Sequence, residues 1–112
     1  AKTLQHTLDT AGVTCATVMA MDSRSAVAEL GSVDAVLLDP PCSGFGQRPL
    51  LPNEQIDLNA SIQQYQFQFT ERAVSLLKDG GTLIYSTCTL NPLENELVVA
   101  KMLAAYECLE LV

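Results

Sequence analysis

The spacing of hydrophobic positions alternates along this chain between the period of a helix and the pattern of a buried strand. Helical segments have apolar residues three and four positions apart, whereas strand segments are short continuous runs rich in β-branched side chains. Turn-forming residues, mostly Gly, Pro, Asn and Asp, separate the segments. We expect helices over residues 2–10, 25–30, 61–78 and 93–106, and strands over residues 13–20, 33–38 and 82–87, with a last short strand beginning at Cys108.

Turn and cap residues define the limits of the predicted elements. The strand at 33–38 ends before Pro40 and Pro41, because proline lacks the amide hydrogen that a sheet requires. Residues 43–60 contain several Gly and Pro and predict a loop of a length that is usually functional. Asn91 is followed by Pro and, three positions on, by Glu, which predicts the start of the last helix.

Strands that alternate with helices predict an α/β fold with a doubly wound parallel sheet. A right-handed crossover through the helix at 61–78 would place the strand at 82–87 in the same sheet as the strand at 33–38. Both strands would then end at one edge of the sheet. The core face of the crossover helix is expected to contain Ile62, Tyr65, Phe69, Ala73, Leu76 and Leu77, with Phe67 off that face.

Composition indicates one small folded domain. The chain has 112 residues, of which 48% are hydrophobic, so it can bury a modest core and does not resemble a disordered segment. No apolar stretch reaches the roughly 20 residues that a membrane helix needs. No signal peptide is recognisable either. We therefore expect a cytoplasmic protein, with a nuclear or nucleolar location as the alternative.

The charge balance argues against a nucleic-acid binder that acts by itself. The formal net charge is −7, and the six basic residues are scattered singly along the chain. Affinity for a phosphate backbone comes largely from contacts with Lys and Arg. Any role on RNA or DNA would therefore need basic surfaces from elsewhere.

Four cysteines divide into two kinds by their surroundings. No C-x-x-C pair is present and no histidine lies close by, so a zinc site and a disulfide framework are both disfavoured. Cys15 and Cys108 stand among apolar residues and are expected to be inert and buried. Only Cys42 and Cys88 follow predicted strands closely and stand beside turn residues.

The positions of Cys42 and Cys88 predict an enzyme. In parallel α/β proteins the chemistry collects just beyond the carboxyl ends of the strands, so the two thiols would face one pocket. Cys88 precedes a predicted helix start, whose dipole favours a thiolate suited to covalent attack on an electron-poor ring. Asp39, at the end of its strand, could polarise a ring nitrogen. Alternatively, both cysteines are small turn residues, since buried free cysteine is common.

The motifs around these residues resemble the Nol–Nop–Sun family of RNA cytosine-5 methyltransferases. The segments that support the resemblance are 38–44, 85–89 and 94–96, which occur in the family's order and spacing over nearly the whole chain. The resemblance implies that the thiol of Cys88 attacks C6 of cytosine, that Cys42 assists release of the product, and that Asp39 contacts the cytosine edge. The target base must leave its stack to reach such a pocket.

The resemblance also implies a cofactor and further contacts. S-adenosyl-L-methionine would supply the methyl group, with Asp22 accepting from its adenine amine and with Asp39 and Pro41 beside it. Among the loop residues, Phe45 could stack on a base or simply pack. Arg48 could touch a phosphate or remain solvated. The implied substrate contacts are Ser43, Phe45 and Arg48.

The family's glycine-rich cofactor loop, its ribose-binding acidic residue and its upstream lysine are not found among these residues. In the family's sheet, two strands that are absent here separate the strands at 13–20 and 33–38. We therefore expect a partial catalytic domain that, isolated, is inactive and poorly stable. Its RNA partner, transfer RNA first and ribosomal RNA second, would bind through other parts of the protein. Glu94 and Glu96 are expected mainly as helix N-terminal charges.

Two other functions remain open at this stage. Residues 39–41 also resemble the Asp-Pro-Pro motif of enzymes that methylate exocyclic nitrogens. Those enzymes need no thiol and place an aromatic residue after the prolines, so Cys42 and Cys88 count against them. A scaffold domain that keeps the fold without the activity is the other alternative.

Overall fold

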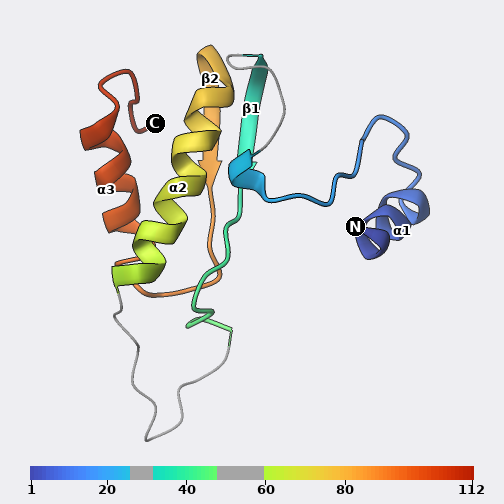
Figure 1. Ribbon diagram of the computed structural model, residues 1–112, viewed down its shortest axis with the longest axis horizontal. Helices are drawn as coiled ribbons and strands as arrows, with labels where there is room; N and C mark the ends of the chain where they lie inside the picture. Colours follow the sequence, from blue (N-terminus) through green and yellow to red (C-terminus); the bar gives the residue numbers. More distant parts are fainter. Residues whose placement is uncertain (26–31, 48–59) are drawn as a thin grey trace, which may run out of the picture.

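The computed structural model describes residues 1–25, 32–47 and 60–112. Its elements, in chain order, form an α/β arrangement in which one long helix connects the two strands (Figure 1). The elements are α1 (Lys2–Thr10), the 3₁₀ turn η1 (Ser23–Ser25), β1 (Val33–Leu38), α2 (Ala60–Leu76), β2 (Leu77–Tyr85) and α3 (Glu96–Ala105). The predicted helices at 2–10 and 61–78 and the strands at 33–38 and 82–87 are thus confirmed, with ends shifted by a few residues.

Strands β1 and β2 form a two-stranded parallel sheet, as the sequence predicts. Their register pairs Leu38 with Tyr85 at the carboxyl ends, so the two strands end level with each other. Near the start of the sheet the register shifts, and the residues of β2 just before Thr82 bulge out. Gly80 has φ +75° there, a conformation that residues with a side chain rarely adopt.

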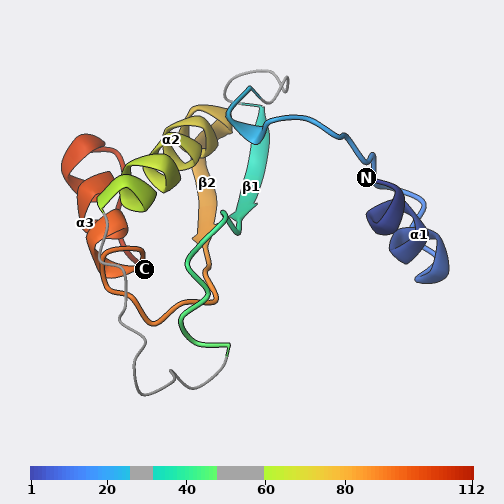
Figure 2. The same ribbon diagram turned by 60° about the horizontal axis from the view of Figure 1, so that its bottom comes forward.

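The described residues cover only one face of this sheet. Helix α2 contacts both strands and lies across one side of the sheet in both views (Figures 1 and 2). On the other side Leu37 and Ile84, which are paired across the strands, are 71% and 53% exposed. Parallel sheets normally have both faces covered. One-sided cover explains why exposed and half-buried residues alternate along β1 and β2.

The core lies where α2 packs against α3 and the sheet. Its buried apolar residues are Phe67, Phe69, Ala73, Val98 and Met102. The expectation for α2 is wrong in two places: Phe67 is only 7% exposed, whereas Tyr65 is 38% exposed. Contacts with α3 as well as with the sheet widen the buried side of α2 to include Phe67, and Lys101 of α3 places its ammonium 4.1 Å from that ring.

Two predicted strands are not formed. Residues 13–20 are not part of the sheet and most of their side chains are exposed, and the chain after Cys108 is not a strand either. A strand needs a neighbour for its amide and carbonyl groups, and no neighbour lies beside these segments in the described sheet. For the same reason Cys15 and Cys108 are exposed rather than buried. Helix α1 stands apart at the far end of the 13–20 segment (Figure 2).

The last helix begins later than predicted. Asn91 is buried and its side-chain oxygen accepts a hydrogen bond from the amide of Leu93, so the chain makes a turn there. The helix itself starts at Glu96, after Asn95. Of the predicted helix at 25–30, only Ser25 lies within the described residues, and it belongs to η1. No helix among the described residues is both long and apolar enough to cross a membrane.

Candidate active site

The two thiols that follow the strands meet at the carboxyl edge of the sheet. Cys42 follows β1 and Cys88 follows β2, and their sulfur atoms are 3.1 Å apart. The level strand ends explain the contact, because the amide of Ser86 still donates to the carbonyl of Leu38 at 2.9 Å. Cys88 is exposed and Cys42 is half-buried. The predicted proximity of the two cysteines is confirmed.

A second set of contacts joins the loop after Cys42 to the loop that holds Cys88. The amide of Leu90 donates to the carbonyl of Phe45 at 2.5 Å. A Cβ atom at Gly46 would lie 3.0 Å from the carbonyl oxygen of Cys88, closer than side chains normally come. The Gln47 amide donates to the Cys88 sulfur at 3.2 Å. Glycine at position 46 therefore lets the two loops touch beside the thiols.

The carboxylate of Glu94, expected mainly as a helix N-terminal charge, is buried beneath both loops. Glu94 has no exposed surface, and its two oxygens accept from Ser43, Gln66 and Asn91. Burial alone would raise the pKa of Glu94, but these hydrogen bonds outweigh it and hold the pKa below its ordinary value. In the sequence, Glu94 stands three residues after Asn91, and we interpreted this position as that of a negative charge at a helix N-terminus.

The neighbouring thiol controls the acidity of Cys88. The hydrogen bond with Cys42 raises the pKa of Cys88, burial and the charge on Cys42 raise it further, and the Gln47 amide acts in the opposite direction. This raised pKa is opposite to the thiolate preference that a helix dipole was expected to give Cys88. Helix α3 starts only at Glu96, so its N-terminus is not beside this sulfur in the chain.

Removing the Cys42 thiol should make Cys88 more acidic. In Cys42→Ala the S–H···S contact is lost, so we expect the pKa of Cys88 to fall toward its ordinary value and its alkylation by iodoacetamide to reach half-maximal rate at a lower pH. Mass spectrometry of the Cys88 peptide across a pH series measures this. Cys15→Ala is the control and should leave the midpoint unchanged. An unchanged midpoint in Cys42→Ala would show that the Cys42 thiol does not raise the pKa of Cys88.

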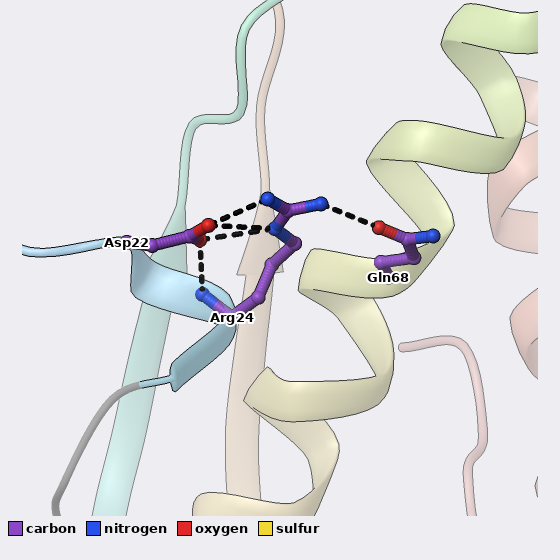
Figure 3. A network of polar contacts seen from close by, with 3 residues as sticks. All are labelled: Asp22, Arg24 and Gln68. Atoms are coloured by element: carbon purple, nitrogen blue, oxygen red, sulfur yellow. Dashed lines mark hydrogen bonds and ion pairs between the residues drawn. The ribbon is translucent and has the colours of Figure 1, made fainter.

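Asp22, the residue expected to contact the cofactor's adenine, forms an ion pair with Arg24. Arg24 donates to both carboxylate oxygens of Asp22 from its backbone and its guanidinium, and reaches Gln68 on α2 at 2.8 Å (Figure 3). The guanidinium also lies 5.1 Å from the ring of Tyr65 and 5.7 Å from that of Phe69. The Arg24 hydrogen bonds lower the pKa of Asp22 to about 2. Arg24 thus takes up the acceptor sites expected to face the adenine amine.

The other predicted site residues are placed in different ways. Asp39 and Pro41 are exposed just beyond β1, and the Pro41 carbonyl accepts from Gln66. Ser43 is half-buried, and both its amide and its hydroxyl donate to Glu94. Phe45 is half-buried, and Arg48 lies outside the described residues. No group of three or more metal-binding side chains occurs within the described ranges.

A cavity lies away from the thiols. It has a volume of about 750 Å³ and is bounded by β2, α3 and the C-terminal segment, with Leu83, Met102 and Leu109 among its lining residues. Neither Cys42 nor Cys88 lines it. The thiol pair is instead reached from the surface, through the exposed side of Cys88.

The sequence of this chain is similar to those of known RNA methyltransferases. The family model described as 16S rRNA methyltransferase RsmB/F matches residues 1–112. Human (Homo sapiens) tRNA (cytosine(72)-C(5))-methyltransferase NSUN6 is 47% identical over 81 residues, which are 71% of this chain and 17% of the human protein. Ribosomal RNA small subunit methyltransferase F of Klebsiella pneumoniae (strain 342) is 37% identical over 110 residues, 94% of this chain and 23% of that protein.

A solved structure agrees with the fold. The crystal structure of NSun6 from Pyrococcus horikoshii with SFG superimposes with a TM-score of 0.79 at 31% sequence identity. The match covers 93% of this chain and 27% of that chain. The parallel strand pair and its connecting helix form an incomplete Rossmann-like fold, and this chain spans between 17% and 27% of the length of the relatives named here.

Proposed function

Because this chain belongs to the RsmB/F family of 16S rRNA methyltransferases, within the Nol–Nop–Sun group, we propose that it is part of the catalytic domain of an RNA cytosine-5 methyltransferase. The observation that supports the proposal most directly is the 3.1 Å separation of the Cys42 and Cys88 sulfur atoms. Transfer RNA is the first proposed substrate and ribosomal RNA the second, since relatives of both kinds are similar to this chain.

Cys88 is the proposed nucleophile. Its thiolate forms a bond from sulfur to C6 of cytosine, and the electron pair of the C5–C6 double bond moves to C5. The side chain is exposed, so an unstacked base can approach it, and the Gln47 amide stabilises the thiolate by donating to its sulfur. Asp39, exposed at the end of β1, would accept a hydrogen bond from the cytosine edge.

Cys42 is proposed to complete the reaction. After C5 has been methylated, the Cys42 thiolate takes the proton from C5, the C5–C6 double bond forms again, and the C6–sulfur bond breaks to release Cys88. A base must lie within reach of both C5 and the adduct. A sulfur atom 3.1 Å from the nucleophile meets this requirement, because C5 and C6 are neighbouring ring atoms.

The residues present fit S-adenosyl-L-methionine in part. When bound, this cofactor supplies the methyl group. Asp39 and Pro41 are exposed at the carboxyl edge of the sheet, where a carboxylate acceptor and an apolar surface would hold it. Asp22 would have to share its carboxylate with Arg24. Support for this cofactor comes from the related structure solved with SFG, an S-adenosylmethionine analogue.

The charge of the chain bears on how RNA is bound. With 13 acidic and six basic residues, this part of the protein offers little attraction to a phosphate backbone. We therefore propose that most of the affinity for RNA comes from basic surfaces outside these 112 residues.

Covalent capture tests the proposed function. The full-length protein that contains this chain is incubated with 5-azacytidine-substituted transfer RNA and, separately, ribosomal RNA, together with S-adenosyl-L-methionine. We expect a denaturation-resistant protein–RNA complex whose attachment site maps to Cys88. Methylation of an exocyclic nitrogen without any adduct would refute the proposal in favour of an amino-methyltransferase, and neither product would indicate a scaffold.

A further inference from the structure

The buried carboxylate of Glu94 receives more hydrogen bonds than any neutral side chain could accept. One oxygen accepts from the Ser43 amide at 2.9 Å and from the Gln66 side chain at 3.0 Å. The other accepts from the Ser43 hydroxyl at 2.5 Å and from the Asn91 side chain at 2.9 Å. Four donors converge on two oxygens, and only an ionised carboxylate accepts at all four sites.

The orientation of Gln66 supports this interpretation. Its side-chain nitrogen donates both to Glu94 and to the Pro41 carbonyl, and both of these atoms are acceptors. The other end of the amide, its oxygen, is buried without a hydrogen-bond partner among the described residues. Leaving a buried oxygen unpaired is unfavourable, so the amide is oriented by the two acceptors that face its nitrogen.

These contacts reach the residues next to both thiols. Ser43 follows Cys42 directly, and its hydroxyl also lies 2.9 Å from the hydroxyl of Thr89, which follows Cys88 directly. The amide of Asn91 donates to the same Thr89 hydroxyl at 3.1 Å. One buried carboxylate thus connects the loop after β1 with the loop after β2.

We propose that Glu94 is a positioning residue, whose buried carboxylate holds the Cys42 and Cys88 loops at the separation at which the two sulfur atoms meet. It touches neither sulfur and acts through Ser43, Thr89 and Asn91. Its importance for catalysis rests on the proposed function, whereas its effect on the thiol pair does not. Loss of the carboxylate leaves donors from both loops without an acceptor, and the loops can then separate.

A dithiol reagent measures the geometry of the pair directly. Phenylarsine oxide bridges two neighbouring thiols: two arsenic–sulfur bonds form and the arsenic-bound oxygen leaves as water with both thiol protons. The full-length protein is treated with this reagent, and mass spectrometry identifies the fraction in which Cys42 and Cys88 are bridged. The comparison is between Glu94→Gln and Glu96→Gln, an identical change at an exposed residue only two positions away.

We expect the bridging rate at Cys42 and Cys88 to fall about tenfold or more in Glu94→Gln, the change that loss of one hydrogen bond to a charged group produces, and to stay unchanged in Glu96→Gln. The measurement is made at a temperature at which circular dichroism shows both variants folded. Wild-type bridging in a folded Glu94→Gln protein would overturn the proposal, because Glu94 would then serve stability alone.

A second variant covers the case in which Glu94→Gln does not fold. Ser43→Ala removes the hydroxyl that touches Glu94 and Thr89 but keeps the backbone amide, so we expect a smaller, severalfold loss of bridging. If both variants fold, the double variant should bridge no more slowly than Glu94→Gln alone, since Glu94 acts through Ser43. An unchanged bridging rate in Ser43→Ala would contradict the proposal that Glu94 acts on the two thiols through the Ser43 hydroxyl.

Capture of 5-azacytidine-substituted RNA separates this proposal from the proposed function. Glu94→Gln should lower the maximal rate of adduct formation by about tenfold while the RNA concentration at half-maximal rate stays the same, because the carboxylate does not face solvent. If wild-type protein forms no adduct, the proposed function fails, and the arsenical result still decides the role of Glu94. An adduct rate in Glu94→Gln equal to that of wild type would overturn the importance of Glu94 for catalysis, whereas the arsenical result decides its effect on the thiol pair.

Discussion

Replacing Cys88 with alanine is expected to abolish methyl transfer to RNA, lowering the single-turnover rate by about 10⁴-fold or more. The reason is that no other sulfur in the described structure can take its place. Cys42, whose sulfur lies 3.1 Å from that of Cys88, is half-buried and would have to attack C6 from a different position. The measurement is transfer of radiolabelled methyl groups from S-adenosyl-L-methionine to RNA by the full-length protein, with excess enzyme.

Stability should change little in this variant, because Cys88 is exposed and exposed substitutions usually alter the free energy of unfolding by less than about 0.5 kcal/mol. Cys108→Ala, also at an exposed cysteine, is the matched control and should retain wild-type activity. Methyl transfer by Cys88→Ala within tenfold of the wild-type rate would exclude Cys88 as the nucleophile.

Replacing Cys42 with alanine should have a different effect and make the covalent intermediate accumulate. Attack by Cys88 and methylation at C5 can proceed, but the proton at C5 has no base to receive it, so release slows by about 10²–10⁴-fold. The expected observation is a denaturation-resistant complex with ordinary, unsubstituted RNA, visible as a band of reduced mobility. Its appearance should require S-adenosyl-L-methionine, since the step that is blocked follows methylation.

The double variant Cys42→Ala/Cys88→Ala is the control for this accumulation and should form no complex. Such a result would show that the retained RNA is attached at Cys88 rather than trapped nonspecifically. If Cys42→Ala turns over ordinary RNA at the wild-type rate and accumulates nothing, the proposed role of Cys42 is wrong, although Cys88 could still be the nucleophile.

Much of the site could be predicted because it depends on strand ends. The prolines after Leu38 and the apolar run that stops before Ser86 define where the two strands end. Two parallel strands joined by one helix must end at the same edge of their sheet. The approach of Cys42 and Cys88 follows from these local signals. The assignment of their roles came from the resemblance and stays a prediction that the variants above test.

Other features could not be predicted because they depend on partners distant in the sequence. Glu94 has the pattern of a helix-end charge, and only folding brings Ser43 and Gln66 to its oxygens. The contacts of Arg24 with Tyr65 and Gln68 likewise depend on how α2 lies against η1.

The sequence by itself determined the strand–helix–strand order from β1 through α2 to β2, the parallel pairing of these strands and the meeting of the two thiols, since each follows from local spacing and from this order. Only the tertiary structure decided which segments find partners. Residues 13–20 have the composition of a buried strand but remain unpaired, because strand formation requires a neighbouring edge. Glu94, by contrast, is buried as a carboxylate because four donors from three segments surround it.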